Sequence, residues 1–454
     1  MKNFKKFWKL GREEFNTQFF DVSKDGGLVV KEGNYQYNFH DLVNRFNSPL
    51  EVVFPFIIEK RLNDLMQTFN YHLKDQNYKG RFYYHYPMKV NQNKEFVLSL
   101  ISEGANLETS SYNELWLVRK LWEQGQFSPR IRVICNGPKT DKYLGLITEL
   151  RDKGLSIIPM IEDLNEYESL KKYRGDVGIR LCLDIKIKSH WDKKFDRYGL
   201  ISEEIIDLGR IRNLKILHYH IGSQVIEQDD FVRAAKKAME VYIELKKDNP
   251  SLDTLDIGGG LAVPYEKKKS YNVSNIIKKI IITLKRESEQ AGINPPNIIC
   301  EWGRYMVAPA QVTIFKVLCE KPILNGAAKK WYVIDGSFIN DMIDTWAIHQ
   351  KWHITPVNNI KAKKLNRVWL AGSSCDSDDR YTAGGTYTLL PRLEDIDNGG
   401  WQYLVILDTG AYQDPLASHH CLLSSPAKVI AQNGVITVAR RRETADEVGR
   451  LFGW

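Results

Sequence analysis

The chain has 454 residues, 43% of them hydrophobic, which is enough to bury one large core and a second, smaller one. Its 64 Lys and Arg residues exceed its 56 Asp and Glu residues and give a net charge of +8, but the basic residues are scattered. The densest groups, Lys267–Lys269 and Arg440–Arg442, are too short to indicate a protein that binds nucleic acid.

Hydrophobicity and cysteine spacing limit the class of protein further. No segment has the roughly 20 apolar residues of a membrane-spanning helix, and Met1–Asn16 lacks the apolar stretch of a signal peptide. The six cysteines are far apart and lack the CxxC spacing of zinc sites and redox pairs. We therefore expect a soluble, cytoplasmic protein with reduced thiols, in which every cysteine except Cys375 is a small buried hydrophobic residue.

Along most of the chain, short apolar runs alternate with longer amphipathic stretches, as in βα units around a parallel sheet. The expected strands are Phe82–Tyr86, Ala105–Glu108, Ile131–Cys135, Ser156–Ile161, Val177–Leu183, Lys215–Tyr219, Thr254–Ile257 and Asn297–Cys300. Helical patterns follow such runs, for example at Ser111–Gln124, Phe231–Lys247 and Val273–Gln290. These units predict an α/β fold with a (β/α)8 TIM-type barrel.

After Arg304, β-rich runs without long helices predict a C-terminal antiparallel β domain. These runs are Gln311–Leu318, Trp331–Ile334, Val368–Leu370, Tyr403–Leu407 and Val435–Val438. The strand-like segment Gly27–Phe39 is expected to join that sheet, and a last helix is expected to begin near Thr444, which has capping-box spacing with Glu447. We expect the barrel at residues 51–306 and the β domain at residues 307–454, joined by the N-terminal segment 1–50.

The distinctive polar residues of the first domain follow the C-terminal ends of its strands, which is the rim where barrels of this kind carry out chemistry. They are Lys89, Glu108, Asn136, Asp184, His220, Gly258, Gly259, Gly260 and Glu301. Lys89 lies in YHYPMKVNQ, and a lysine at a barrel mouth can form a Schiff base because burial lowers its pKa. Taken alone, a lysine that ends a strand is more often a solvated charge.

Two neighbouring motifs indicate a site for a phosphate and an aromatic ring. The three glycines in LDIGGGLAV leave backbone amides open to a phosphate, although tight turns use glycines too. In HYHIGSQ, Ser223 can donate a hydrogen bond to the same phosphate and His220 can lie flat against a ring. His218 and His220 share a strand face, so a metal pair is the alternative, but no third ligand has a recognisable motif nearby and we expect no metal.

Two further motifs supply charge and a thiol. Glu301, in CEWGRYMVAP, can pair with a protonated pyridine nitrogen while Arg304 faces a phosphate, and the alternative is a structural ion pair between them. In GSSCDSDDRY, a carboxylate beside Cys375 suits a substrate with a distal positive charge and a thiol that gives up a proton. Acidic loops of this kind often bind nothing or a stray cation, and the closing Glu of a calcium loop is missing.

Nearly the whole chain resembles the fold type III pyridoxal-phosphate decarboxylases, which act on ornithine, diaminopimelate and arginine, and among them it is most similar to the biosynthetic arginine decarboxylases. The resemblance is carried by YPMKVNQ, LETSSYNEL, ICNGPK, HYHIGSQ, LDIGGGLAVPYE, IDTWAIHQ, SCDSDD and GAYQD. It implies the cofactor pyridoxal 5'-phosphate, a basic amino acid as substrate, and decarboxylation of L-arginine to agmatine and CO2 in polyamine biosynthesis.

The resemblance also implies a role for each matching residue. Lys89 would carry the cofactor, His220 would stack on its ring, and Glu301 would bind the pyridinium nitrogen, with Glu108 near the ring. The phosphate ligands would be Ser223, Gly259, Gly260, Gly303, Arg304 and Tyr412. In a homodimer with shared sites, Cys375 of one subunit would protonate the substrate carbanion, and Asp376, with Asp344 as a second candidate, would contact the distal cation.

Two motifs depart from the arginine-specific pattern. The chain reads CDSDDRY where those enzymes usually have CDSDG, and GAYQD continues as PLASHHCLLSSP. The chain is also shorter than typical members and lacks a long helical insertion between the barrel and the SCDSDD loop. Ornithine, lysine, diaminopimelate or another basic amino acid therefore remain alternative substrates, and a non-catalytic regulator is an alternative of another class.

Overall fold

The computed structural model describes residues 19–187, 189, 197–265, 271–396 and 400–454. The chain folds into two compact units. A barrel unit runs from Glu59 to Met306, and a sheet unit combines the residues up to Ile58 with those from Val307 onward, together with Pro264 and Tyr265. The sheet unit is therefore assembled from both parts of the chain that flank the barrel.

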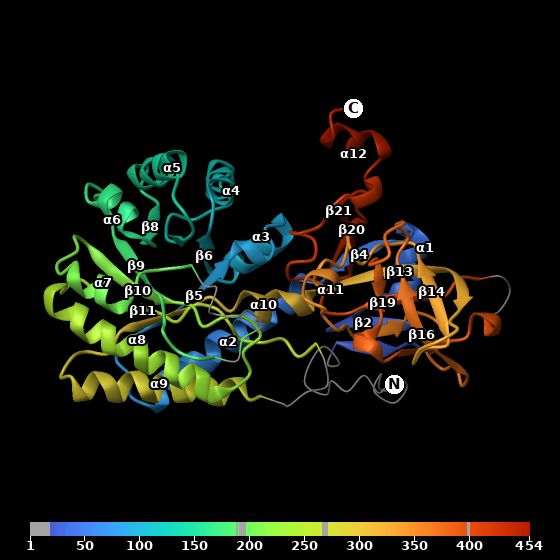
Figure 1. Ribbon diagram of the computed structural model, residues 1–454, viewed down its shortest axis with the longest axis horizontal. Coiled ribbons are helices and arrows are strands. Elements are labelled where there is room, and N and C mark those ends of the chain that lie inside the picture. The colour runs from blue at the N-terminus through green and yellow to red at the C-terminus, as the bar shows by residue number, and fades with distance from the viewer. Residues whose placement is uncertain (1–18, 188, 190–196, 266–270, 397–399) are drawn as a thin grey trace. The chain divides into compact units, whose positions relative to one another are not determined.

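The barrel unit is a closed ring of eight parallel strands, and helices lie around it (Figure 1). Its strands are β5 (Phe82–Pro87), β6 (Asn106–Thr109), β7 (Arg132–Cys135), β8 (Ser156–Ile161), β9 (Val177–Leu181), β10 (Leu214–Tyr219), β11 (Thr254–Asp256) and β12 (Asn297–Cys300). Strand β12 pairs with β5 and closes the ring, as at Ile298 and Phe82. All eight strands expected from the apolar runs are present, and the predicted fold class is confirmed.

The helices of this part of the chain alternate with the strands. They are α2 (Pro55–Asp75), α3 (Lys94–Ser102), α4 (Tyr112–Glu123), α5 (Asp141–Asp152), α6 (Leu164–Leu170), α7 (Ser202–Asp207), α8 (Gln228–Asp248), α9 (Val273–Gln290) and α10 (Gly303–Val307). Local chemistry fixes their starts: the Ser111 hydroxyl accepts from the Glu114 N–H at the start of α4, and the Thr140 hydroxyl caps α5 in the same way.

An apolar layer fills the interior of the barrel. Its members come from four strands and are Ile134, Ile158, Met160, Ile216 and Ile299. Gly178 on β9 is required by this packing, because a Cβ there would lie 2.2 Å from the Met160 sulfur. The barrel is therefore a packed core at this level and not a pore.

The sheet unit contains a three-stranded sheet and a ten-stranded sheet. Its elements are β1 (Phe20–Val22), β2 (Leu28–Glu32), β3 (Tyr35–Asn38), α1 (Phe39–Phe46), β4 (Leu50–Val53), β13 (Gln311–Pro322), β14 (Lys330–Ile334), α11 (Asp344–Ala347), β15 (Ile354–Pro356), β16 (Leu365–Ala371), β17 (Arg380–Tyr381), β18 (Thr388–Pro391), β19 (Tyr403–Ile406), β20 (Ala427–Gln432), β21 (Val435–Arg440) and α12 (Ala445–Leu451). Helix α12 has the predicted capping box, because the Thr444 hydroxyl accepts from Glu447 N–H and the Glu447 carboxylate accepts from Thr444 N–H.

Two expectations about this unit are wrong in detail. The large sheet is not purely antiparallel, because β4 runs parallel to β20 and β14 runs parallel to β16. The segment Gly27–Phe39 does form strands, but they belong to a separate sheet in which β2 pairs with β1 on one side and with β3 on the other. Periodicity identifies strands, whereas their partners depend on long-range contacts that a single sequence does not encode locally.

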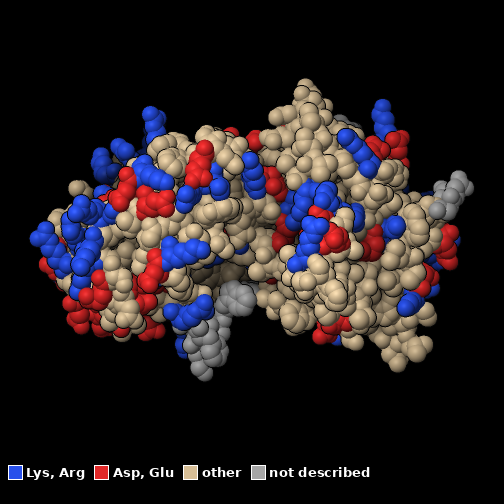
Figure 2. All heavy atoms as spheres, turned by 90° about the horizontal axis from the view of Figure 1, so that it is seen from above, with Lys and Arg blue, Asp and Glu red and all other residues tan. Residues whose placement is uncertain are grey.

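On the face drawn in Figure 2, Lys and Arg side chains and Asp and Glu side chains both occur over each unit. None of the helices in the described ranges combines the length and the apolar character needed to cross a membrane.

Candidate active site

A layer of polar side chains lies above the apolar layer of the barrel. Asn136, His218 and Glu301 each lie two residues beyond a core isoleucine, which belongs to β7, β10 and β12 respectively. Because side chains two residues apart on a strand share a face, these three project into the barrel, one level nearer its C-terminal end. Asp256, the last residue of β11, is the register partner of His218 and belongs to the same layer.

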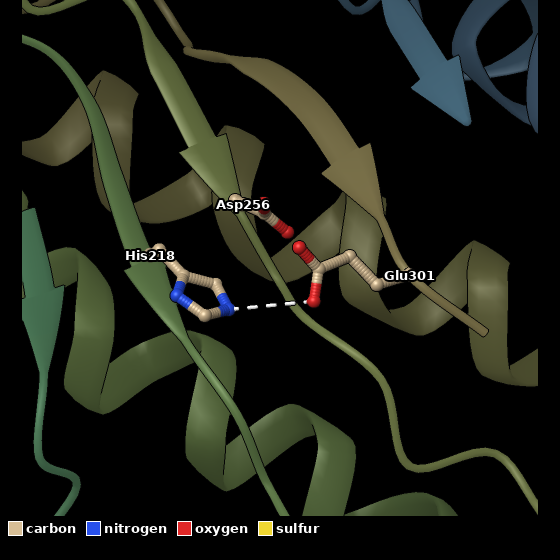
Figure 3. A group of neighbouring side chains, drawn as sticks. All are labelled: His218, Asp256 and Glu301. Atoms are coloured by element: carbon tan, nitrogen blue, oxygen red, sulfur yellow. Dashed lines mark ion pairs between the residues drawn. The ribbon is translucent and has the colours of Figure 1, made fainter. Parts of the chain in front are cut away.

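Glu301 is the centre of this layer, and Figure 3 shows His218 and Asp256 pointing toward its carboxylate. His218 Nε2 lies 3.6 Å from one carboxylate oxygen, and the Asn136 amide donates to the other at 3.4 Å. Burial alone would raise the pKa of Glu301, but the charges of His218 and Lys89 outweigh it and hold the pKa at about 2. Glu301 is therefore a buried anion at neutral pH.

Glu108, near the end of β6, has the opposite character. Its side chain is fully buried, and burial together with the nearby Glu301 carboxylate raises its pKa to about 8. The Ser110 hydroxyl donates to one of its oxygens at 2.7 Å. Glu108 therefore keeps its proton to a higher pH than an ordinary glutamate does.

His220 presents a neutral ring next to the glycine turn. Its pKa lies well below the ordinary value because the half-buried ring is largely removed from water and because Lys89 and Arg180 carry positive charge nearby. Its Nδ1 accepts a hydrogen bond from the Gly259 N–H at 3.2 Å, which fixes the tautomer and the ring plane. A neutral imidazole held in this way can stack on an aromatic ring.

The glycine turn has no room for side chains. Gly258 has a φ of +61°, and a Cβ there would lie 2.1 Å from the Tyr219 carbonyl oxygen. Gly260 has a φ of +127°, and a Cβ there would lie 2.6 Å from the Ile221 side chain. Ser223, in the loop after β10, donates its N–H to the Ser189 hydroxyl at 2.9 Å. Such a cradle of backbone amides fits a phosphate.

Lys89 lies in the one-turn 3₁₀ helix Met88–Val90 directly after β5. Met88 and Val90 are buried but Lys89 is exposed, so the expected burial of its amine is not found. The charge of Lys89 still acts on Glu108, His220 and Glu301, so it belongs to the same rim. Gly303 packs against this turn, because a Cβ there would lie 2.6 Å from the Pro87 ring. The half-buried Arg304 follows at the start of α10.

These residues fit pyridoxal phosphate. The glycine cradle would hold its phosphate, the neutral His220 ring would cover one face of its pyridine, and the buried anion Glu301 would pair with its ring nitrogen. Lys89 would supply the amine for a covalent link.

The remaining predicted site residues belong to the sheet unit. Tyr412 is half-buried with a φ of +69°, and Asp344 is buried in α11, where its N–H donates to Gln413 Oε1 at 3.1 Å. Cys375 and Asp376 are both exposed, on the loop between β16 and β17. The His420 ring lies 3.3 Å from the Asp376 carboxylate. Their predicted roles toward cofactor and substrate stay predictions.

The departure from CDSDG has a structural reason. Asp379, the residue in place of glycine, is buried, and its carboxylate accepts from the Phe338 N–H at 2.6 Å and the Ser374 N–H at 3.1 Å. Its N–H in turn donates to the Asp376 carbonyl at 3.1 Å. Asp379 therefore anchors the loop that carries Cys375.

Sequence reasoning missed several groups of the barrel rim. Asp256 is one of these groups, and the feature that could have identified it is a carboxylate within the apolar run TLDI. The sequence also shows no motif for a third metal ligand, yet donor atoms of His218, Asp256 and Glu301 all lie within 4.8 Å of one another. A buried ion pair, which the sequence analysis also did not identify, joins Lys139 and Glu166 at 3.0 Å. The expectation of buried thiols is also wrong for Cys319 and Cys421, which are exposed, and for Cys182, which is half-buried.

The barrel, its lysine turn, its glycine cradle and its buried carboxylate define a class of proteins that bind pyridoxal phosphate at the C-terminal rim of parallel strands. Residues 58–308 match the model of the family described as pyridoxal-dependent decarboxylase, pyridoxal binding domain, and the chain belongs to this family.

Individual relatives agree with this family. The chain is 28% identical over 370 residues to the biosynthetic arginine decarboxylase of Prochlorococcus marinus (strain MIT 9515), an alignment that covers 74% of this chain and 56% of the relative. The chain thus spans little more than half of that relative's length.

Solved structures share the fold. The biosynthetic arginine decarboxylase of Campylobacter jejuni has a TM-score of 0.79 and 22% identity, covering 96% of this chain and 89% of its own. A diaminopimelate decarboxylase from M. jannaschii has a TM-score of 0.81 and 22% identity, covering 95% of this chain and 96% of its own. Because enzymes with different substrates fit equally well, the fold alone does not select the substrate.

Proposed function

We propose that this protein decarboxylates a basic amino acid with pyridoxal phosphate, and that its substrate is L-arginine, giving agmatine and CO2 for polyamine biosynthesis. The observation that carries the chemistry is the buried anion Glu301 next to the glycine cradle, whose Gly259 N–H donates to the neutral His220 ring. Arginine is supported by the curated relative, which is named a biosynthetic arginine decarboxylase.

The cofactor, when bound, supplies an electron sink for the electron pair that remains on the substrate after CO2 departs. Glu301 binds the ring nitrogen and keeps that nitrogen protonated, while His220 orients the ring by covering one face. Lys89, on the turn after β5, would hold the cofactor through its Nζ.

The phosphate is bound by Ser223, Gly259, Gly260, Gly303, Arg304 and Tyr412 in this proposal. Glu108, whose pKa is raised by burial and by Glu301, would lie beside the ring. Cys375 Sγ holds the proton that is delivered to Cα, and the Asp376 carboxylate, with Asp344 as second candidate, receives the distal guanidinium. The exposed position of Cys375 and Asp376 on one anchored loop supports a role toward a ligand outside their own unit's core.

A substrate panel tests the reaction. Purified protein is incubated with L-arginine, ornithine, lysine and diaminopimelate, and CO2 and the amine products are measured. We expect agmatine as the main product, and no product from Lys89→Ala. Lys94→Ala, which removes a lysine at the start of α3, is the matched control and should retain activity. A higher kcat/KM for another amino acid would replace arginine, and no turnover of any would favour the non-catalytic regulator.

We further propose a homodimer with active sites shared between subunits, in a reducing compartment such as the cytoplasm. Inactive Lys89→Ala and Cys375→Ala proteins are mixed and allowed to exchange subunits. Random exchange makes half of the dimers mixed, each with one intact site, so about a quarter of wild-type activity should return. If native mass spectrometry shows exchange but no activity returns, the shared site is refuted.

A further inference from the structure

The neighbours of Glu301 pose a problem of charge. Glu301 and Asp256 are both buried, and Figure 3 shows their carboxyl groups facing each other. Two carboxylates in a low-dielectric interior repel each other strongly, so one of them retains its proton. Which one retains it decides whether Glu301 can act on a ring nitrogen.

The surroundings of the two carboxyl groups differ. Glu301 faces His218 Nε2 at 3.6 Å and receives the Asn136 amide at 3.4 Å. One oxygen of Asp256 accepts a backbone hydrogen bond, from the Gly258 N–H at 2.9 Å. Burial and the adjacent Glu301 raise the pKa of Asp256 well above its ordinary value. The charge therefore resides on Glu301 and the proton on Asp256.

Strand register makes this arrangement rigid. His218 and Asp256 are paired positions on the adjacent parallel strands β10 and β11. Asp256 is paired in turn with Ile299 on β12, two residues before Glu301. All three side chains thus lie on one interior face, on strands whose apolar neighbours are closely packed.

We propose that Asp256 and His218 are positioning residues for the cofactor: His218 favours the anion of Glu301 and Asp256, as the neutral acid, holds its carboxylate in place toward the ring nitrogen of bound pyridoxal phosphate. The inference rests on the role of Glu301 in the proposed function. It concerns cofactor binding and is independent of the amino acid that the enzyme decarboxylates.

The test compares two ligands. Apoprotein is titrated with pyridoxal phosphate and with its 1-deaza analogue, in which carbon replaces the ring nitrogen, and Kd is obtained from absorbance. His218→Phe and the milder His218→Gln should weaken the binding of pyridoxal phosphate about tenfold but change that of the analogue less than about threefold. A purely structural role would weaken both ligands equally, which would overturn the proposal.

The Asp256 variants test whether Asp256 acts as a neutral, protonated acid. Asp256→Asn keeps a neutral donor and should change the Kd of pyridoxal phosphate less than about threefold, whereas Asp256→Ala should weaken it about tenfold. An effect of Asp256→Asn as large as that of Asp256→Ala would show that Asp256 acts as an anion and would contradict the proposal. Circular dichroism checks that each variant is folded.

A matched control and a competing ligand complete the design. His72→Phe removes another buried histidine of this unit, whose Nε2 lies 2.8 Å from the Ser274 hydroxyl, and should leave both Kd values unchanged. The competing ligand is a divalent cation, to which His218, Asp256 and Glu301 offer one imidazole and two carboxylates. Elemental analysis of the purified holoprotein should find no stoichiometric metal that the His218 variants lose, and finding one would overturn the proposal.

A protein that binds the cofactor as described but releases no CO2 would refute the proposed function alone.

Discussion

The Sγ atoms of Cys375 and Cys421 lie 3.6 Å apart, although 46 positions separate the two residues in the chain. The segment with Cys421 is held by Asn340, which accepts from the Ser418 hydroxyl at 2.7 Å and the His420 N–H at 3.0 Å. Two anchored loops thus bring the thiols together, and the hydrogen bond and the charge of Cys421 raise the pKa of the Cys375 thiol.

The first prediction follows from this contact. Cys421→Ala should lower the pKa of Cys375, because the group that disfavours its thiolate is removed. The pKa is measured from the rate at which iodoacetamide alkylates Cys375 across a pH series. Peptide mass spectrometry follows the alkylation. Cys319→Ala removes another exposed thiol and should leave the profile unchanged. Identical profiles for Cys421→Ala and wild type would rule out the coupling.

The second prediction concerns the close packing of Gly303 against the Lys89 turn. Gly303→Ala would place a methyl group 2.6 Å from the Pro87 ring and 2.7 Å from Val90. Overpacking of this kind costs about 1–3 kcal/mol, and displacement of the turn should also weaken cofactor binding. Thermal unfolding and cofactor titration measure the two effects.

Gly145 provides the control for that substitution. It lies within α5 and a Cβ there would meet nothing within 4 Å, so Gly145→Ala should stabilise the protein by about 0.5–1 kcal/mol. Equal stability of the Gly303→Ala protein and wild type would mean that the turn yields without cost.

The third prediction tests the loop anchor. Asp379→Ala leaves the buried N–H groups of Phe338 and Ser374 without their acceptor, which should cost about 1–3 kcal/mol and lower kcat/KM through disorder of the Cys375 loop. Asp378→Ala, on the exposed side of the same loop, should stay within about 0.5 kcal/mol of wild type. Urea unfolding and steady-state kinetics give both numbers. Similar losses for the two variants would refute the anchor.

The fourth prediction is a pH dependence of stability. Burial and the Arg132 charge lower the pKa of His85 to about 3, below its unfolded value of about 6.5. Between these values the unfolded chain binds the extra proton, so the free energy of unfolding falls as pH falls, by about 1.4 kcal/mol per unit.

His85→Gln removes this titration. Between pH 6.5 and 5.0, its free energy of unfolding should therefore decrease by about 1.6 kcal/mol less than that of wild type. Urea unfolding at the two pH values measures the difference. Parallel losses in the two proteins would show that His85 is protonated in the fold.

The sequence allowed the barrel to be predicted strand by strand because each strand is a short apolar run that ends at a glycine, proline or polar residue. Pairing was harder: Gly27–Phe39 has the same alternation whether it joins the large sheet or, as found, pairs with β1. Local patterns determine which face a strand buries but not which strand lies beside it.

The candidate site shows the same division. Lys89, the glycines of LDIGGG and Glu301 stand out because polar or flexible residues interrupt apolar runs. Asp256 did not stand out in the sequence, because its partners His218 and Glu301 are tens of residues away. Only the register of β10, β11 and β12 brings the three residues together. The exposure of Lys89 was also beyond prediction, since it depends on where the turn after β5 points its side chain.

The ionisable layer above the apolar interior of the barrel has a consequence for the newly made chain. Buried acids and imidazoles are expensive to desolvate, and a ligand that compensates them stabilises only the folded form, by about 2.7 kcal/mol when it is present at a hundred times its Kd. Before it acquires its cofactor, the chain lacks that contribution and opens more often to proteases. Its abundance in a cell should therefore rise and fall with the supply of vitamin B6.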